Sequence, residues 1–390
     1  MKKSMVLKGA LISALIIFIL PFTTSCQTKN QVSVDNDVTK TTDKKIEKLQ
    51  DLIDKNYIGK IKDEDLEEGI YKGFIEGLDD PYSVYYTEEE TKALVEQTSG
   101  EYSGIGAVLS QDRDTGVITI LQVYEDSPAE EAGLKEGDSF LKVGDTELTS
   151  KDDITEVVRL IKGEEGTKVE LTVYRNKEKK EFTTTAIRRK IQAKTVTTKM
   201  LEDNIGYLAI SEFDSVTLDQ YKEGLKSLSD QGMKKLIVDL RNNPGGNLDT
   251  VTDILDLMLP KGISVCMEDK GGNKKEFKTD EENKFDKPLV VLVNGNSASA
   301  SEIYAGAIQD FKTGTIIGTT TYGKGVVQQI FDLKDGTSVK LTIAEYFTPK
   351  GRNINKKGIT PDVECEYQEN EKSPEADNQL DKAIEYIKEK

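Results

Sequence analysis

The chain has 390 residues, 36% of them hydrophobic, which is enough for two or three globular domains. Its 53 basic and 70 acidic residues give a formal net charge of −17, which repels phosphates and argues against a nucleic acid partner. The three cysteines lie far apart and the sequence has no histidine, so neither a disulfide framework nor a metal site is expected. An enzyme built from this chain cannot use imidazole as its base.

The first 26 residues have the pattern of an export signal. Three lysines accompany the start of an apolar stretch at residues 9–20. Cys26 follows small residues as in a bacterial lipobox, so lipidation there is one expectation, and retention of the leader as a membrane anchor is the alternative. Both place the protein at the extracytoplasmic face of a bacterial membrane, tethered through its N-terminus, and secretion is the further alternative.

Residues 27–42 are polar and indicate a flexible linker, so the fold is expected to begin near residue 43. Within 43–95, apolar residues recur at helical spacing in two stretches, which predict a helical N-terminal arm with a turn at Asp79-Asp80-Pro81. Packing against the rest of the chain and dimerisation both suit such an arm, and the sequence does not separate them.

The remaining chain changes pattern twice. Residues 96–190 predict short strands between glycine turns, interrupted by one helix at about 151–161. Residues 191–364 alternate strands and helices as an α/β core does, and 365–390 form an acidic tail with a helix at 378–388. The expected strands are 104–109, 116–123, 139–143, 168–175, 205–210, 235–240, 289–293, 315–318 and 339–347, and the core helices are 218–229, 250–259 and 300–311.

Ser299 lies where a buried strand gives way to a turn and a predicted helix. Unpaired amides and the positive end of the helix dipole favour an alkoxide there, and the amide of Ala300 can help to hold an oxyanion. The segment Ser299-Ala300-Ser301-Glu302 also fits a capping box, in which Ser299 only stabilises the helix start. On these residues alone, capping is the favoured interpretation.

Lys324 lies between two glycines, and no charged residue is close to it in sequence. Burial lowers a lysine pKa from about 10.4 towards neutrality, and a neutral amine can take the proton of a serine. If 322–330 is extended, Lys324 and Gln328 lie on one face, where the amide of Gln328 can orient the amine. A solvated lysine in a glycine loop is the alternative for this segment alone.

Taken together, the motifs resemble the C-terminal processing peptidases of the S41 serine protease family. The core motifs are DLRNNPGG, SASASE, YGKG with a glutamine four residues beyond its lysine, and YFTPKGRNINKKGITPDV. GLDDPYSVYYT and the closing NQLDKAIEYIKEK also match, so the likeness covers 43–364 and the C-terminal end. Residues 96–190, with YSGIGAVL, SPAEEAGLKEGDSFLKVGD and IKGEEGTKVELTVYR, resemble the PDZ domains of bacterial proteases.

The resemblance implies a multidomain α+β protein with a helical arm, a PDZ domain and an α/β peptidase core of the crotonase or ClpP type. It implies that Ser299 is the nucleophile, Lys324 the general base and Gln328 the residue that orients it. The amides of Gly245 and Ala300 correspond to the oxyanion donors, and no metal or cofactor takes part.

In such PDZ domains, a loop of backbone amides holds the terminal carboxylate of a peptide, which adds to the sheet as a strand beside the helix. Here that loop is expected at Ser103, Gly104, Ile105 and Gly106. The implied partners are proteins or peptides with free C-terminal tails, and the family often self-associates. A glycine hairpin without a ligand is the alternative.

Two further positions bear on the expected mechanism. Asp310 lies eleven residues beyond Ser299, about 16 Å along a helix, so it is expected to support the helix end rather than the dyad. Lys162 stands where the family often has an arginine that couples the PDZ domain to the catalytic site, and lysine lacks the bidentate fork.

The sequence therefore predicts an exported serine endopeptidase that cleaves proteins near their C-termini with a Ser-Lys dyad. A catalytically inactive PDZ scaffold that binds C-terminal tails is the alternative function. A crotonase-type acyl-CoA enzyme is disfavoured, because the export signal removes the protein from cytoplasmic CoA.

Overall fold

The computed structural model describes residues 38–280, 282, 284–369 and 376–390. The predicted export signal, with Cys26, lies outside the described residues. The chain divides into two compact units, Met1–Lys62 and Asp63–Lys390, and the division falls inside the arm predicted at 43–95. Among the described residues, no helix combines the length and the apolar character needed to cross a membrane.

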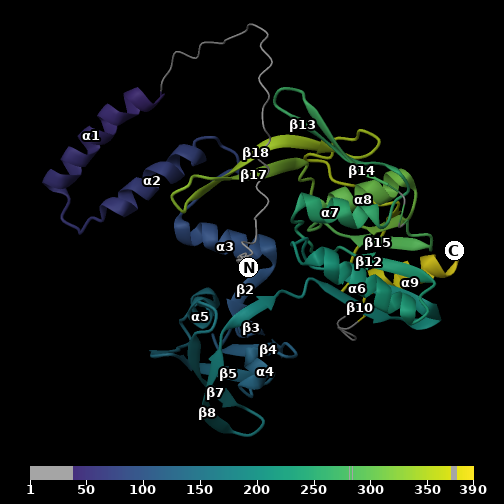
Figure 1. Ribbon diagram of the computed structural model, residues 1–390, viewed down its shortest axis with the longest axis horizontal. Coiled ribbons are helices and arrows are strands. Elements are labelled where there is room, and N and C mark those ends of the chain that lie inside the picture. Colours follow the sequence, from purple (N-terminus) through teal and green to yellow (C-terminus); the bar gives the residue numbers. More distant parts are fainter. Residues whose placement is uncertain (1–37, 281, 283, 370–375) are drawn as a thin grey trace, which may run out of the picture. The chain divides into compact units, whose positions relative to one another are not determined.

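The first unit contains helix α1, Val38–Asn56, drawn in purple in Figure 1. Its start corrects the expected linker at 27–42, because helical backbone already begins at Val38. The segment from 38 to 42 contains neither glycine nor proline, so a helix that has formed in the following turns can extend through it. The apolar side chains of α1 are largely exposed, with Leu49 at 50% and Leu52 at 48%.

The second unit opens with helix α2 (Asp63–Glu76), strand β1 (Val84–Tyr86) and helix α3 (Glu88–Ser99). The predicted turn separates α2 from β1, and Asp79 in it has φ of +53°. Strand β1 pairs antiparallel with β18 (Ser338–Phe347), which lies more than 250 residues further along the chain. This pairing joins the arm to the peptidase half of the chain.

A β-sheet domain with two helices, α4 and α5, follows. Its sheet has the order β3-β4-β5-β7-β8, with β6 beside β5, and helix α5 contacts β3 and β5. The apolar core of this domain includes Ile120, Val157 and Leu171. Strands β2 and β9 form a separate two-stranded ribbon. The elements are β2 (Glu101–Gly104), β3 (Ala107–Gln111), β4 (Ile118–Val123), α4 (Pro128–Glu131), β5 (Asp138–Val143), β6 (Thr146–Glu147), α5 (Ile154–Ile161), β7 (Lys168–Arg175), β8 (Lys180–Ile187) and β9 (Arg189–Gln192).

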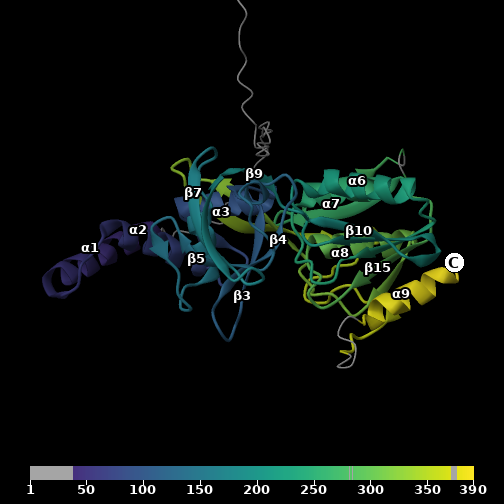
Figure 2. The same ribbon diagram turned by 90° about the horizontal axis from the view of Figure 1, so that it is seen from below.

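The peptidase core is built on a six-stranded sheet of order β10-β11-β12-β15-β16-β19, parallel except for β10. Val238 and Val291 face the core that contains residues of helices α6, α7 and α8, whereas Ile237 and Val290 face helix α9. Burial on both faces explains the continuous apolar runs of the central strands. Figure 2 shows α6 and α9 on opposite sides of this sheet. The strands are β10 (Val196–Met200), β11 (Ile205–Ile210), β12 (Lys235–Asp239), β15 (Leu289–Val293), β16 (Thr315–Gly318) and β19 (Val363–Glu364), and the helices are α6 (Thr217–Asp230), α7 (Leu248–Asp256), α8 (Ala300–Phe311) and α9 (Asn378–Lys388).

A second sheet of the same unit carries the residues that follow the catalytic lysine candidate. Strand β18 pairs with β17 (Val326–Asp332), with β1 and with β13 (Gly262–Asp269), which in turn pairs with β14 (Lys274–Thr279). Strand β17 pairs only with β18 within the described residues, so its outer edge is unpaired. The mixed architecture predicted from the sequence is confirmed.

Candidate active site

Ser299 lies between strand β15 and helix α8 in a backbone conformation that is rare outside glycine, with φ of +53° and ψ of −114°. Such a conformation costs about 1–3 kcal/mol and persists only where neighbours impose it. Here the Ser299 amide donates to Glu302 Oε2 at 2.9 Å, and the hydroxyl of Tyr346 donates to the Ser299 carbonyl oxygen at 3.1 Å. The surrounding structure therefore fixes the backbone that carries this hydroxyl.

The capping box that the sequence offered as the alternative for Ser299 is present in the structure. Of its two bonds, only the one to the Glu302 carboxylate has full hydrogen-bond geometry. The serine hydroxyl makes no cap hydrogen bond, and its side chain is half-buried. The bonds that fix Ser299 are therefore those of its backbone.

Gly245 and Ala300, the expected oxyanion donors, lie next to Ser299. A Cβ atom on Gly245 would be 2.7 Å from Ser299 Cβ and 2.9 Å from the nitrogen of Ala300, so only glycine fits. Ala300 is the first residue of α8, where helix amides lack intrahelical acceptors. In this conformation the Gly245 amide donates to Asn243 Oδ1 at 2.8 Å, so a substrate carbonyl must compete with Asn243 for that donor.

Lys324 lies in a loop rather than in a strand, which corrects the expectation that 322–330 is extended. Strand β17 begins only at Val326. Gly323 has φ of +90°, and a Cβ there would be 2.9 Å from the Lys357 nitrogen. A Cβ on Gly325 would be 2.5 Å from the nitrogen of Asn355. The two glycines therefore let the chain around Lys324 pack against the backbone of the segment at 355–358.

The environment of Lys324 favours a neutral amine in part. Burial lowers the pKa of Lys324, and the positive charge of Lys340 lowers it further. The carboxylates of Asp80 and Glu302 act in the opposite direction. The expected fall of the lysine pKa is thus present in direction, with two acidic groups limiting it.

The side chain of Gln328 bonds to the neighbouring strand in this conformation. The strand pairing shifts by one residue between Val327 and Gln328, so the simple alternation assumed for an extended segment is broken. Gln328 Nε2 donates to Thr342 Oγ1 at 3.2 Å on the neighbouring strand β18. Among the described residues, no hydrogen bond joins Gln328 to Lys324.

Glu302 is the residue of the site whose importance the sequence did not reveal. Its carboxylate is completely buried, and four donors surround it. Besides the Ser299 amide, Oε2 accepts from the Lys324 amide at 2.8 Å, while Oε1 accepts from the Gly323 amide at 2.7 Å and the Thr321 hydroxyl at 2.6 Å. One carboxylate thus ties the backbone of the nucleophile candidate to the backbone of the base candidate.

The amine of Lys324 is next to the ring of Tyr82 in this conformation. No hydrogen bond joins the side chains of Ser299 and Lys324 in the described part of the chain, and Lys324 Nζ lies 4.7 Å from the centroid of the Tyr82 ring. The segments themselves are joined directly as well, because the Tyr322 amide donates to the Ser297 carbonyl oxygen at 3.0 Å. The site is assembled at its backbone, and the lysine side chain is turned towards Tyr82.

Asp310 contacts neither Ser299 nor Lys324. It lies near the end of α8, where Oδ1 accepts from Arg352 Nη2 at 2.6 Å and Oδ2 accepts from the Lys350 amide at 2.9 Å. This arrangement agrees with the prediction that Asp310 supports the helix end and the adjoining loop.

The expected peptide-binding loop of the PDZ domain is shorter than predicted. Ser103 and Gly104 belong to strand β2 and pair with β9, so only Ile105 and Gly106 connect β2 to β3. The first predicted strand, 104–109, is correspondingly divided into two. Strand β3 pairs only with β4 among the described residues, and its other edge lies beside α5, where an added strand can pair.

Lys162 follows the last residue of α5 and bridges the PDZ domain to the arm. Its Nζ lies 2.9 Å from Glu96 Oε2 of α3 and 4.8 Å from the ring centroid of Tyr102. A lysine makes this single contact where an arginine would offer a bidentate fork.

The described residues contain no group of three acidic or cysteine side chains that could hold a metal ion.

Three family models match the chain, and they follow the order of its domains. Residues 18–91 match the N-terminal domain of the activating protease CtpB, 119–175 match a PDZ domain, and 204–365 match peptidase family S41. The protein belongs to the S41 peptidase family, among the carboxy-terminal processing proteases that carry a PDZ domain. The resemblance seen in the sequence motifs is confirmed.

Individual relatives agree with this assignment. The carboxy-terminal processing protease CtpA of Bacillus subtilis is 38% identical over 335 residues, which cover 85% of this chain and 71% of the relative. A CtpA-like serine protease of Staphylococcus epidermidis is 36% identical over 327 residues, covering 82% of this chain and 65% of the relative, just under two thirds of its length.

Two solved structures align with most of this chain, and the second of them shares its fold. The photosystem II D1 C-terminal processing protease is 30% identical, with a TM-score of 0.48 and coverage of 82% of this chain and 86% of the other. An S41-type protein of Bacteroides fragilis is 18% identical, with a TM-score of 0.52 and coverage of 86% and 91%.

Proposed function

We propose that the protein is an exported serine endopeptidase that cleaves protein substrates near their C-termini with Ser299 as nucleophile and Lys324 as general base. The observation that carries this proposal is the buried Glu302 carboxylate, which holds the amides of both residues. A shared anchor keeps the two backbones in fixed register, so the side chains need only rotate to meet. Hydrogen bonds of a catalytic pair commonly tighten only when substrate is bound.

The reaction would be acyl transfer in two halves. Neutral Lys324 takes the Ser299 proton as the oxygen attacks the substrate carbonyl, and the amides of Gly245 and Ala300 hold the oxyanion. The lysine then gives the proton to the leaving amine, and an acyl-serine remains. Water, deprotonated by Lys324, attacks the acyl group, and the proton returns to Ser299 as the acid product leaves.

The PDZ domain would select substrates by their free C-terminal tails, which would add as a strand along β3 beside α5. The unpaired edge of β3 supports this mode. A flexible protein substrate should therefore lose turnover when its C-terminal carboxylate is amidated, mainly through a higher KM. Equal KM values for the free and amidated substrates would contradict tail capture.

We also propose that the N-terminal segment takes the enzyme to the extracytoplasmic face of a bacterial membrane. Residues 1–26 carry the basic and apolar pattern of an export signal, and Cys26 follows small residues. Radiolabelled palmitate should label the wild type and not Cys26→Ala if Cys26 is lipidated. Absence of label with the protein still in the membrane fraction would favour an uncleaved anchor.

The decisive experiment compares the wild type with Ser299→Ala and Lys324→Arg on a denatured, flexible protein. Both variants should fold and lose turnover by about 10³-fold or more, because an arginine cannot act as the base. Ser301→Ala and Lys340→Arg are matched controls on the same helix and on β18, and both should keep turnover. Full activity in Lys324→Arg would overturn the dyad, and absence of cleavage by the wild type would favour the inactive scaffold.

A further inference from the structure

The loop at residues 79–83, hereafter the arm loop, reaches the catalytic lysine from a distant part of the sequence. Tyr82 presents its ring to Lys324, with Nζ 4.7 Å from the ring centroid. The loop continues into β1, which pairs with β18 in the register Val84↔Lys340. The Thr342 amide of β18 also donates to Ser83 Oγ at 3.1 Å. These bonds fix the arm loop to the strand beside the site.

The charged groups that face Lys324 come from three elements. Lys340 on β18 repels its ammonium form, whereas Asp80 of the arm loop and Glu302 of α8 attract it. The face of the Tyr82 ring also favours the ammonium form through its negative quadrupole. Two of the three groups that stabilise a protonated Lys324 therefore belong to the arm loop.

The arm loop also connects to Gln328 through one threonine. Asp80 accepts from the Ser83 hydroxyl at 2.5 Å and from the Tyr82 amide at 3.2 Å. Partial burial opposes the effect, but these bonds and one from the Thr342 side chain lower the pKa of Asp80, which stays charged. Thr342 Oγ1 in turn accepts from Gln328 Nε2 at 3.2 Å.

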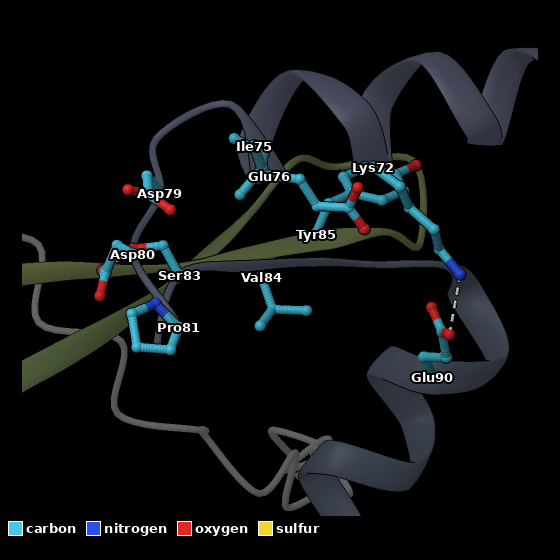
Figure 3. A pocket seen from close by; sticks show the side chains of 10 residues that line it. All are labelled: Lys72, Ile75, Glu76, Asp79, Asp80, Pro81, Ser83, Val84, Tyr85 and Glu90. Carbon is cyan, nitrogen blue, oxygen red and sulfur yellow. Dashed lines mark hydrogen bonds and ion pairs between the residues drawn. The ribbon is translucent and has the colours of Figure 1, made fainter.

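The side of the arm loop that faces helices α2 and α3 borders a cavity. This cavity of about 520 Å³ lies between the loop, α2 and α3, with Asp79, Asp80 and Ser83 in its lining. Figure 3 shows these side chains and the ion pair of Lys72 with Glu90, 2.9 Å apart. Because the loop is not densely packed on this side, side-chain substitutions in it should leave the fold intact.

We propose that the arm loop is part of the catalytic site, where Tyr82 and Asp80 act as positioning residues for Lys324. Tyr82 holds the amine in its resting place, and Tyr82 and Asp80 stabilise the ammonium ion that forms when Lys324 has taken the Ser299 proton. The proposal rests on the proposed function, because it assigns both residues to the same proton transfer. The proposal gives the arm loop a role at Lys324, although the two are far apart in the sequence.

The test measures Lys324 directly and does not depend on turnover. In the Ser299→Ala background, acetic anhydride would label amines over a range of pH, and mass spectrometry would follow the label at Lys324. Tyr82→Leu keeps an apolar cover and removes the ring, and Asp80→Asn removes the charge and keeps the shape. Each should move the labelling midpoint of Lys324 to lower pH, with labelling about two- to fivefold faster below the midpoint.

Tyr386→Leu is the matched control, since that ring lies 5.0 Å from Lys390 Nζ at the other end of the chain. It should leave the labelling of Lys324 unchanged. In the otherwise wild-type enzyme, Tyr82→Leu and Asp80→Asn should move the acid limb of kcat/KM to lower pH, a change that a purely structural loop would not produce. Tyr82→Phe retains the ring, so in the Ser299→Ala background the labelling midpoint of Lys324 should stay where it is with Tyr82.

Unchanged labelling midpoints in folded Tyr82→Leu and Asp80→Asn proteins would overturn the proposal. This failure is distinct from failure of the proposed function. If Ser299→Ala or Lys324→Arg kept full turnover, the dyad would fall, while the labelling experiment would still decide whether Tyr82 and Asp80 set the state of Lys324.

Discussion

Glu302 holds Lys324 by its backbone, with Oε2 accepting from the lysine amide at 2.8 Å, and not by its amine. The same oxygen accepts from the Ser299 amide at 2.9 Å. A buried carboxylate between the two backbones fixes the spacing of the proposed nucleophile and the proposed base.

Glu302→Gln should reduce kcat by about 10²-fold or more, because a displacement on the order of 1 Å between reacting groups has that effect. The glutamine side chain has the same volume, but its NH₂ group would face hydrogen-bond donors that in the wild type bond to a carboxylate oxygen. Turnover of a flexible protein and the unfolding temperature would both be measured. Ser301→Ala, a buried neighbour that donates to the Asn243 carbonyl at 3.0 Å, is the control. A kcat near that of the wild type would show that the clamp does not set the geometry.

Gly245→Ala should strongly reduce turnover while the protein stays folded. The new Cβ would lie 2.8 Å from the Ala298 oxygen and 2.9 Å from the Ala300 nitrogen, at the proposed oxyanion site. Loss of an oxyanion donor costs about 10²–10³-fold in kcat. Gly232→Ala imposes a similar positive φ, +88° against +108°, but meets no atom within 4 Å. It should cost stability and keep kcat, and equal kcat values for the two variants would contradict the assignment.

Asp310→Asn should lower stability and leave the pH dependence of kcat/KM unchanged. The substitution weakens the bonds to Arg352 and to the Lys350 amide, and a hydrogen bond to a charged group contributes about 1.5–3 kcal/mol. Arg352→Ala should reproduce most of the fall in unfolding midpoint. A folded Asp310→Asn protein with normal stability and no turnover would instead assign Asp310 to the chemistry.

Asp214→Asn should make the protein more stable above neutral pH. Burial, with a smaller contribution from the charge of Glu212, raises the pKa of Asp214 from 3.8 to about 7. Because the pKa of Asp214 is higher in the folded than in the unfolded protein, its contribution to the free energy of unfolding is fully present below about pH 4. That contribution is lost as pH rises through 7 and the buried carboxyl becomes charged. The variant should therefore gain most at pH 8, by on the order of 1–4 kcal/mol, and little at pH 4. Urea midpoints at both values test this, with the exposed Asp219→Asn as control, and a gain equal at both pH values would be inconsistent with it.

The architecture was predictable wherever burial alone decided it. Strands β11, β15 and β16 and helix α8 have the bounds that the apolar patterns predicted, because each is packed on more than one side. The condition that 322–330 is extended holds only from Val326, since the glycines beside Lys324 serve close packing against 355–358. The register shift after Val327 has no signal in the sequence.

The parts of the site that escaped prediction depend on contacts between distant segments. Glu302 looked like a capping residue, because three of its four donors lie about 20 residues further along the chain. Tyr82 and Asp80 belong to a loop more than 240 residues from Lys324, so no local pattern connects them. Ser299 itself was recognised by its resemblance to a family, as the residues around it favoured a simple helix cap.

The unusual torsion angles of Ser299 decide how an inert form of the enzyme should be made for trapping a bound peptide. Alanine at 299 carries a Cβ and is held by the same bonds from Tyr346 and to Glu302, so it should preserve the shape that meets the substrate. Glycine at this position would adopt the positive φ without a steric penalty, which would stabilise the unliganded fold. Its greater backbone freedom would also allow the turn to adopt other conformations. A crystallographer seeking a captured complex should choose the alanine form.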